Sequence, residues 1–155
     1  MKIFIADNSY EAIDQLSEMF LEYYSELSES ECLLPLASKG NELWLEALKR
    51  SVGKTSILII AEFSGKPIGF AHGQLKISPD YLGNLRIGTV AHFYIKKPNR
   101  GGDTATLMFT EMINWFKEKN VHSIELQVLK NNYTAEKFWK KMGFEEELNQ
   151  MRLKF

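Results

Sequence analysis

Apolar and polar positions along the chain follow two periods, and these predict where the strands and helices lie. Short apolar or alternating runs predict five strands, at residues 1–7, 55–63, 68–77, 89–95 and 123–129. Apolar residues at helical spacing predict four helices, at about 9–27, 41–49 and 134–142 and after the glycine pair at 101–102. The last residues, 146–155, predict a terminal strand or hairpin.

Turn and cap residues refine these elements. Asn8 or Ser9 is the expected cap of the first helix. Ser64-Gly65-Lys66-Pro67 separates two strands with the chemistry of a hairpin turn. The order is strand, two helices, three strands, helix, strand, helix, strand, which indicates an α/β (α+β) fold. A chain of 155 residues has room for one sizeable core, so we expect a single domain over 1–155.

The charges exclude some partners and mark one region. Nineteen basic against 20 acidic residues give a net charge of -1, so we expect no nucleic-acid partner. The first 31 residues are different, because eight carboxylates there face Lys2 alone: Asp7, Glu11, Asp14, Glu18, Glu22, Glu26, Glu29 and Glu31. One cysteine, no signal-like N-terminus and no long aliphatic run predict a cytoplasmic protein without a membrane partner.

The stretch IKKPNRGGDTATLMF, residues 95–109, carries the first candidate chemistry. A helix N-terminus offers backbone N–H groups without internal partners and a partial positive charge, so it attracts anions. Gly101 and Gly102 remove two side chains at such a position, and Arg100 adds a charge suited to phosphate. Asp103 would repel a phosphate but is a good helix cap. On these residues alone, a plain turn and a phosphate site both remain open.

Other kinds of site find no support in the sequence. Gly53-Lys54-Thr55 resembles the end of a phosphate-binding P-loop, but residue 48 is Leu48 where that motif needs its first glycine. The histidines at 72, 92 and 122 lack metal-ligand spacing, and no nucleophile signature surrounds Cys32. We therefore expect no metal and no covalent nucleophile.

Two signatures in order point to a family. Residues 100–105 after a strand resemble the acetyl-CoA signature R-x-x-G-x-[GA] of the GNAT N-acetyltransferase superfamily. Residues 132–144 are similar to its second signature, N-x-x-A-x-x-F-Y-x-x-x-G-F. The order of elements fits the superfamily along nearly the whole chain. The resemblance implies a mixed, mostly antiparallel central sheet with helices on both faces, and acetyl-CoA as cosubstrate.

The resemblance also implies a role for each matching residue. The strand ending at 95 would splay from 123–129 and pair with the pantetheine arm. The pyrophosphate would bind main-chain N–H groups after that strand, and Asn132 would bind the pantetheine. The cofactor-binding residues are then Phe93, Tyr94, Ile95, Arg100, Gly101, Gly102, Asp103, Thr104, Ala105, Asn132, Phe138 and Trp139. The reaction would be direct attack of a primary amine on the acetyl carbonyl.

Two residues depart from the signatures. Asp103 stands where glycine is preferred, and Trp139 replaces the tyrosine that in many members protonates the leaving thiolate. An indole N–H is not a useful acid near neutral pH, so that proton would come from water or from Tyr133 or another tyrosine. For the base that takes the amine's proton, His92 is the first candidate, ahead of Glu125 and His72.

The acceptor and the assembly stay open at this point. The acidic N-terminal region, with Glu26, Glu29 and Glu31, favours a cationic amine such as a polyamine, an aminoglycoside, a lysine side chain or a protein N-terminus. A solvated helix face explains the same charges. The alternatives are a non-catalytic acyl-CoA-binding or sensing domain and a transferase that uses another acyl-CoA. A homodimer is also left open.

Overall fold

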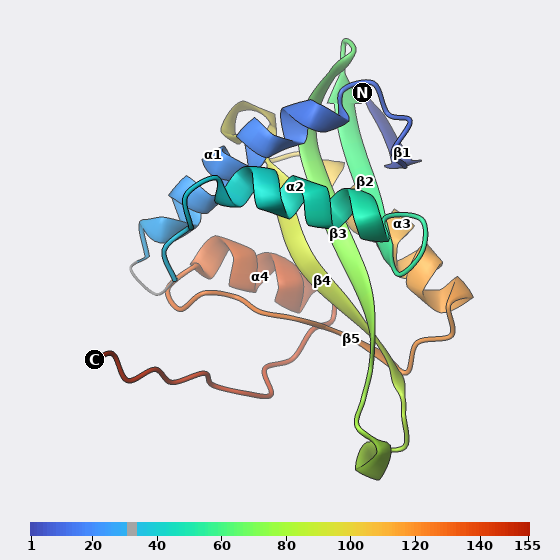
Figure 1. Cartoon of the computed structure of the whole chain (residues 1–155), viewed down its shortest axis with the longest axis vertical. Helices are drawn as coiled ribbons and strands as arrows, with labels where there is room; N and C mark the ends of the chain where they lie inside the picture. The colour runs from blue at the N-terminus through green and yellow to red at the C-terminus, as the bar shows by residue number, and fades with distance from the viewer. Residues whose placement is uncertain (31–33) are drawn as a thin grey trace.

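The computed structural model describes residues 1–30 and 34–155, which form one sheet covered by helices (Figure 1). The strands are β1 (Lys2–Ala6), β2 (Ser56–Phe63), β3 (Lys66–Ile77), β4 (Arg86–Ile95) and β5 (Ser123–Leu126). The helices are α1 (Leu16–Ser28), α2 (Gly40–Ser51), α3 (Thr104–Glu118) and α4 (Tyr133–Lys141). Within the described residues no helix combines the length and apolar character that crossing a membrane requires.

The sheet has the mixed, mostly antiparallel form that the resemblance implied. The strands lie in the order β1-β2-β3-β4-β5, antiparallel except for the parallel pair β4–β5. The predicted hairpin joins β2 to β3, and both of its turn residues, Ser64 and Gly65, have positive φ. Because β5 ends the order, its outer edge has no partner strand among the described residues.

Two apolar cores lie on opposite faces of this sheet, as expected for helices on both sides. Helices α1 and α2 cover one face, where their apolar stripes pack on Leu58, Ile60 and Phe70. Helices α3 and α4 cover the other face, over the alternate strand residues Ile57 and Ile59. Alternation of side chains along β2 therefore supplies both cores, and this explains why that strand is a continuous apolar run.

The first helix begins later than predicted. Neither Asn8 nor Ser9 caps it, because the Asp7 carboxylate accepts hydrogen bonds from the Ser9 N–H and hydroxyl and closes a local turn. A short 3₁₀ turn at Ile13–Gln15 then leads into α1 at Leu16. The prediction placed the helix start at residues with capping chemistry, but Ser9 uses its hydroxyl in the turn and the Asn8 side chain donates to the Lys49 carbonyl at 2.9 Å.

The terminal strand or hairpin predicted at 146–155 is wrong for the chain as described. Residues 145–155 form no strand and leave the body as an exposed tail, seen in red in Figure 1. Strand β5 also ends at Leu126, earlier than the predicted 129. Residues 127–129 lie beyond the last β4–β5 pair, Val90 with Leu126, and residues 146–155 have no partner strand among the described residues.

Candidate active site

Strands β4 and β5 are paired at one end and part at the other. Their parallel pairing runs from Ile87–Ser123 to Val90–Leu126 and ends there. At the same level the β3–β4 register slips between His72 and Gly73, so β4 has one extra residue at 91. Such a bulge bends a strand and raises its twist, which explains why β4 turns away from β5 at this point. The splayed strands predicted from the sequence are thus present.

Beyond the parting point, β4 offers backbone groups that β5 does not use. The Lys96 N–H donates to the Ile68 carbonyl at 2.9 Å, which fixes the residues of β4 that bond to β3. By alternation Tyr94 also bonds to β3, while the N–H groups of Phe93 and Ile95 point toward the gap. Of the three strand residues predicted to bind a ligand, two therefore present free amides, and Tyr94 does not.

The gap leads to the glycine pair and the start of α3. Gly101 has φ +93°, a left-handed conformation that favours glycine, whereas Gly102 does not have a positive φ. A Cβ added at either glycine would meet no atom within 4 Å. Asp103 occupies the N-cap position of α3, but its side chain makes no capping hydrogen bond. The N-terminus of α3 is therefore uncapped by side chains and open to approach by an anion.

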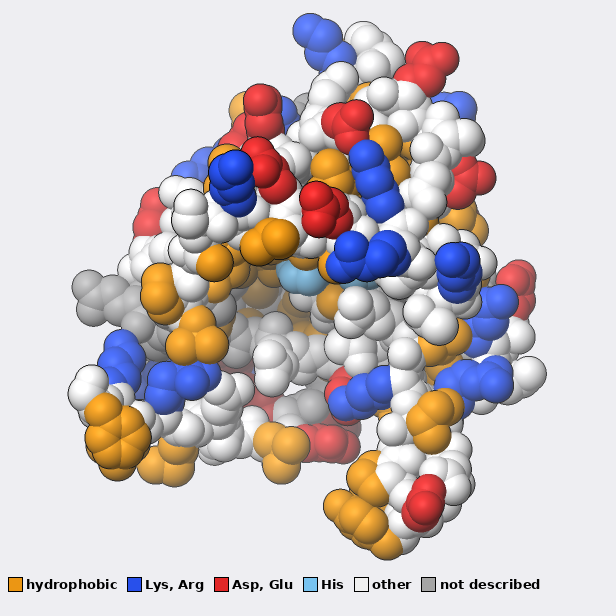
Figure 2. Space-filling model, viewed as in Figure 1, with side chains coloured by type: hydrophobic (Ala, Val, Ile, Leu, Met, Phe, Trp, Pro, Cys, Tyr) orange, Lys and Arg blue, Asp and Glu red, His pale blue; other side chains and the backbone are white. Residues whose placement is uncertain are grey.

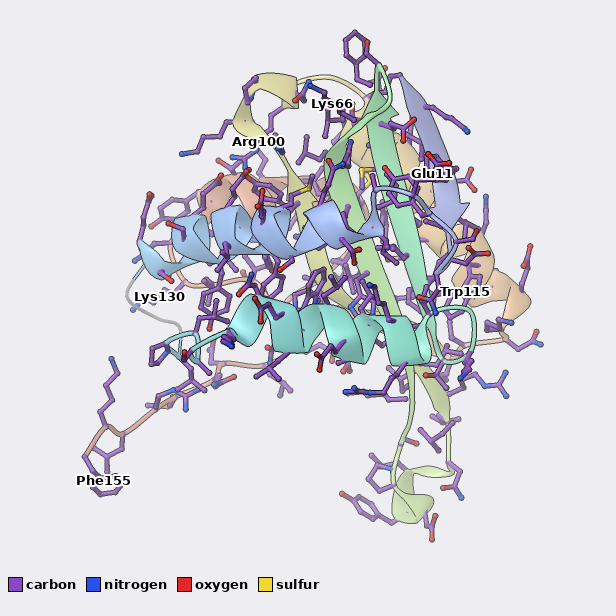
Figure 3. All side chains as sticks on the ribbon, turned by 45° about the horizontal axis from the view of Figure 1, so that its top comes forward. Glu11, Lys66, Arg100, Trp115, Lys130 and Phe155 are labelled. Atoms are coloured by element: carbon purple, nitrogen blue, oxygen red, sulfur yellow. The ribbon has the colours of Figure 1, made fainter. Side chains whose placement is uncertain are left out.

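Arg100 is held by the α1 side of the molecule and by the strand it follows. Its Nε donates to the Ile95 carbonyl at 2.7 Å, and its Nη2 lies 2.8 Å from Glu26 Oε2. Its guanidinium also lies over the Tyr94 ring, 5.4 Å from the centroid. Figure 3 labels Arg100 where the loop after β4 approaches α1. The side chain thus links helix, strand and loop.

Two glutamates of α1 meet the strand and loop in this same network. The Tyr94 hydroxyl donates toward Glu26 Oε1 at 3.0 Å and Glu22 Oε2 at 3.4 Å, and Lys96 Nζ lies 3.6 Å from Glu22. Burial and the hydrogen bond to Glu26 raise the pKa of the Tyr94 hydroxyl, so it stays a donor at neutral pH. Glu22 and Glu26 therefore position the loop that carries the glycines.

This pairing changes the interpretation of the acidic N-terminal region. Asp14 also pairs with Lys49, 2.5 Å away, and Asp7 is bonded to Ser9. Glu29 is exposed, and Glu31 lies outside the described residues. Several of the carboxylates predicted to attract a cationic acceptor thus have partners within the chain, which weakens that prediction.

His72 on β3, which is buried, and His92 on β4, which is half-buried, form a pair beneath α1 and α2. Their rings are parallel, and the Nδ1 atoms are 3.2 Å apart. Desolvation lowers the pKa of His92 to about 4 and, with the neighbouring His92, lowers that of His72 to about 3. Both rings are therefore neutral at physiological pH.

The contact between the two Nδ1 atoms restricts the tautomers, because one of them must carry the shared hydrogen. If His92 donates, its Nε2 keeps a lone pair, as a base requires, and the neutral His72 ring accepts at Nδ1 and carries its only N–H hydrogen on Nε2. That His72 Nε2 is buried without a hydrogen-bond partner in the described structure. If His72 donates, His92 carries a hydrogen on Nε2 and can only donate there. The tautomer of His72 thus determines whether His92 Nε2 can accept a proton or can only donate one.

Aromatic side chains from the helices surround His92, and sequence reasoning missed them. Phe20, Tyr23 and Trp44 place their ring centroids 5.4, 5.9 and 5.7 Å from that of His92. In the space-filling view of Figure 2 the molecule is hollowed below α2, and histidine atoms are visible there. These aromatic residues lie far from β4 in sequence and match no short motif, so only the packing of α1 and α2 identifies them.

The other two catalytic candidates are more exposed. Glu125 on β5 pairs with Lys76 on β3, with half of its side chain exposed. Tyr133, the first residue of α4, is 71% exposed and donates its hydroxyl to Asn131 Oδ1 at 3.2 Å. Each already has a hydrogen-bond or ionic partner, and neither is packed with the histidine pair.

The second signature builds helix α4. Asn132 caps it, because its side-chain oxygen accepts the Ala135 N–H at 3.3 Å. Trp139 is 8% exposed, and its ring contacts those of Phe93, Phe109, Phe138 and Phe144 at centroid distances of 4.8–5.5 Å. The contact with Phe93 joins α4 to the free stretch of β4. Trp139 is thus mainly a core residue at the wall of the gap.

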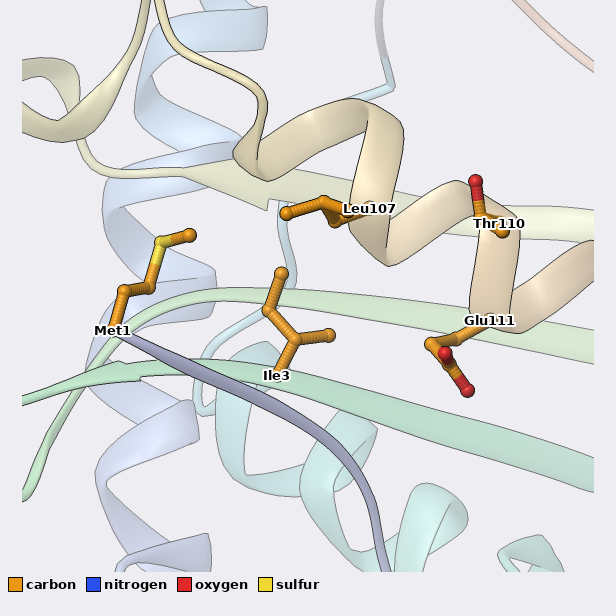
Figure 4. A pocket seen from close by; sticks show the side chains of 5 residues that line it. All are labelled: Met1, Ile3, Leu107, Thr110 and Glu111. Carbon is orange, nitrogen blue, oxygen red and sulfur yellow. The ribbon is translucent and has the colours of Figure 1, made fainter.

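Two further features lie apart from this arrangement. A hollow of about 180 Å³ between β1 and α3 is lined by Met1, Ile3, Leu107, Thr110 and Glu111 (Figure 4). It contains none of the residues predicted for the site. Over residues 1–30 and 34–155, no three side chains of histidine, cysteine or acidic type gather as metal ligands.

Comparison with known proteins assigns the family. The model of the acetyltransferase (GNAT) family matches residues 13–144. The chain therefore belongs to the GNAT acetyltransferase family, which confirms the resemblance and the enzyme class predicted from the two signatures. No curated protein sequence matches the chain.

Solved structures share the fold at low identity. A predicted acetyltransferase from Clostridium acetobutylicum with acetyl-CoA is 22% identical, with a TM-score of 0.74 over 99% of this chain and 96% of that one. The aminoglycoside N-acetyltransferase AAC(6')-Iy in complex with CoA is 12% identical, with a TM-score of 0.77 over 99% and 93%. The ribosomal-protein-alanine N-acetyltransferase from Brucella melitensis biovar Abortus 2308 is 15% identical, with a TM-score of 0.71 over the whole of both chains.

The paired histidines His72 and His92 predict a loss of stability in acid. In the unfolded chain they take up protons near pH 6.5, but in the folded chain only near pH 4 and 3. The stability that the chain gains by keeping these histidines neutral is therefore fully present above the pKa of the unfolded chain. It is lost as the pH falls toward the pKa values of the folded chain. For His92 alone the loss at pH 5 is about 2 kcal/mol.

Urea unfolding at pH 7 and pH 5 measures this dependence. The variant His92→Gln should lose less stability between the two pH values than the wild type. His122→Gln serves as the control, because His122 is exposed. If the free energy of unfolding depends on pH equally in His92→Gln and His122→Gln, the pair of His72 and His92 does not take up protons on unfolding.

Proposed function

We propose that the protein transfers the acetyl group of acetyl-CoA to a primary amine, with the cosubstrate in the gap between β4 and β5. The observation that carries the proposal is the continuity of two features. The free N–H groups of Phe93 and Ile95 lie along the gap, and the uncapped N-terminus of α3 follows it directly in the chain. A molecule with a peptide-like arm and a pyrophosphate matches both.

The pantetheine arm would pair with Phe93 and Ile95 as an added strand does. The pyrophosphate would bind the N–H groups from Gly101 to Ala105, where Gly102 leaves the backbone bare. Arg100 supports this loop through Glu26 and Ile95, so its role is to position the backbone. Phe138 and Trp139 would wall the thioester end from the α4 side.

The reaction is a direct transfer. The amine nitrogen attacks the acetyl carbonyl carbon, a C–N bond forms and the C–S bond breaks, so that CoA leaves as a thiolate. A strand N–H at the parting point would polarise the carbonyl oxygen. The nitrogen loses one proton, and the thiolate gains one from water or a tyrosine such as Tyr133. Trp139 supplies no proton.

The acceptor is best described as an amine that reacts in its neutral form. His92 with a pKa near 4 is a weak base at neutral pH, and the rings of Phe20, Tyr23 and Trp44 around it offer no countercharge. Glu125, paired with Lys76, is the second candidate base. The amine would therefore enter after losing its proton to solvent.

Turnover with a panel of primary amines tests this function. Free-thiol release from acetyl-CoA should require an amine, and its pH profile should shift with the pKa of the amine used. Binding of acetyl-CoA without thiol release for any amine would instead support a non-catalytic acyl-CoA-binding domain. If thiol is released only from another acyl-CoA, that compound is the acyl donor in place of acetyl-CoA. A pH inflection fixed near 6.5 for every amine would indicate a histidine with an ordinary pKa.

Substitution of Gly102 tests the cofactor site. A side chain here meets no other atom, so Gly102→Trp should leave the thermal unfolding temperature unchanged. The same side chain would cover the backbone at the start of α3 and should weaken acetyl-CoA binding at least tenfold, or by about 1.4 kcal/mol. Gly102→Ala is the matched control and should bind more tightly than Gly102→Trp. Equal affinity in both variants and the wild type, measured by calorimetry, would place the pyrophosphate elsewhere.

A further inference from the structure

The outer side of β1 is a free edge of the sheet. β1 stands at one end of the strand order, so within residues 1–30 and 34–155 no strand pairs with this side. A free edge presents backbone N–H and C=O groups on which another chain can form hydrogen bonds. What the edge accepts depends on which groups point outward and on the side chains beside them.

The register of the sheet identifies the outward groups. The Leu75 N–H donates to the Thr55 carbonyl at 2.9 Å, so the odd-numbered residues of β2 bond to β3. The even-numbered residues of β2 therefore bond to the even-numbered residues of β1. This leaves the N–H and C=O groups of Ile3 and Ile5 on the outer side.

These groups are complementary to their own copies. A twofold axis perpendicular to the sheet at Phe4 places Ile3 opposite Ile5 of a second copy, and Ile5 opposite Ile3. Each of the two pairs then exchanges N–H···O bonds in both directions. The axis also aligns the whole of β1, Lys2–Ala6, with its copy. Such a surface meets the requirement of an interface in which both subunits use the same patch.

The side chains of β1 match their copies in the same register. Phe4 lies on the α1–α2 face, where the axis brings it against Phe4 of the second copy. By alternation Ile5 lies on the α3 face, where it is 54% exposed, and the axis sets it beside Ile3 of the second copy. Aromatic and apolar pairs directly across two strands stabilise a sheet.

The hollow between β1 and α3 lies on the face of these isoleucines. Ile3 points from β1 toward Leu107 of α3, as Figure 4 shows, and Leu107 is 47% exposed. Met1, which also lines the hollow, is 60% exposed. Ile5 of a second copy, set beside Ile3, extends the apolar wall of this hollow. The strand pairing thus gives an exposed apolar surface a partner.

The charges at the two ends of β1 are also complementary. The axis places Lys2 opposite Ala6 of the second copy, next to Asp7 of that copy. Hydrogen bonds from the Ser9 side chain and N–H lower the pKa of Asp7, so it is a carboxylate at neutral pH. Each end of the paired strands therefore brings a cation near an anion, and no like charges lie directly opposite each other.

We propose that two copies of the chain form a twofold dimer by antiparallel pairing of β1 with β1, centred on Phe4. The two sheets then become one continuous sheet, with α3 of both copies on the same face. The pairing uses none of the backbone groups of β4 assigned to acetyl-CoA, so it does not depend on the proposed acetyl transfer.

Light scattering tests the dimer. At the concentrations used for NMR, the wild type should have twice the chain mass of 17.9 kDa. Ile5→Lys places a charge in the middle of the interface and should give a monomer. Leu43→Lys is the matched control, because Leu43 on α2 is 56% exposed, and it should remain a dimer. A monomeric wild type, or the same mass for both variants, would overturn the proposal.

A proline variant separates loss of pairing from loss of fold. Because the Ile5 N–H points outward, Ile5→Pro removes a hydrogen bond of the dimer but none between β1 and β2. This variant should be monomeric, while NMR shows the amides of Leu58 and Ile60 still protected from exchange by their bonds to β1. If Ile5→Pro stays dimeric, another surface holds the copies together and the proposal fails.

A disulfide at the axis tests the register. Residue 4 would lie opposite its own copy in a narrow pair, with Cα atoms about 4.5 Å apart, a separation that a disulfide can bridge. In a Cys32→Ser background, Phe4→Cys should give a linked dimer in non-reducing electrophoresis after mild oxidation. Phe63→Cys, exposed on β2, is the control and should not link, because two copies of β1 separate it from its own copy. A dimer that Phe4→Cys does not link would contradict pairing centred on Phe4.

Discussion

The parting of β4 from β5 after Val90 and Leu126 is the constraint on which the rest of the site depends. A continuous ladder would consume the N–H groups of Phe93 and Ile95 and leave no room beside them. The extra residue of β4 at 91 bends the strand where the pairing stops, so one local irregularity creates both the gap and the free donors. The cores on both faces of the sheet hold this geometry, because β4 contributes Tyr94 to one and Ile95 to the other.

The loop after β4 depends on contacts distant in sequence. Glu26 and Arg100 are 74 positions apart, yet their ion pair ties α1 to the residue that precedes the glycines. Exposed ion pairs usually contribute less than about 1 kcal/mol each, so the network with Tyr94 and Lys96 positions the loop more than it stabilises the fold. Some of the N-terminal carboxylates that were predicted to attract a cationic substrate, Glu22 and Glu26, instead pair with Lys96 and Arg100.

Local signals in the sequence predicted the elements well. The turn at Ser64-Gly65 and the apolar spacing of the helices required only neighbouring residues, and both signatures were recognisable from residue types at fixed spacing. The pairing of His72 with His92, their aromatic surroundings and the glutamate contacts of Arg100 could not be predicted, because they depend on register and helix packing. The tail was predicted as a strand for a sound reason, but alternation specifies a buried face without specifying what covers it.

The central claim is that acetyl-CoA occupies the gap by pairing with alternate amides of β4. Hydrogen exchange of individual backbone amides, followed by NMR with and without acetyl-CoA, tests it most directly. The account predicts that Phe93 and Ile95 exchange rapidly in the free protein and become protected on binding, together with Gly102 and its neighbours, while Tyr94 is protected throughout. Binding that leaves Phe93 and Ile95 unprotected would contradict the account.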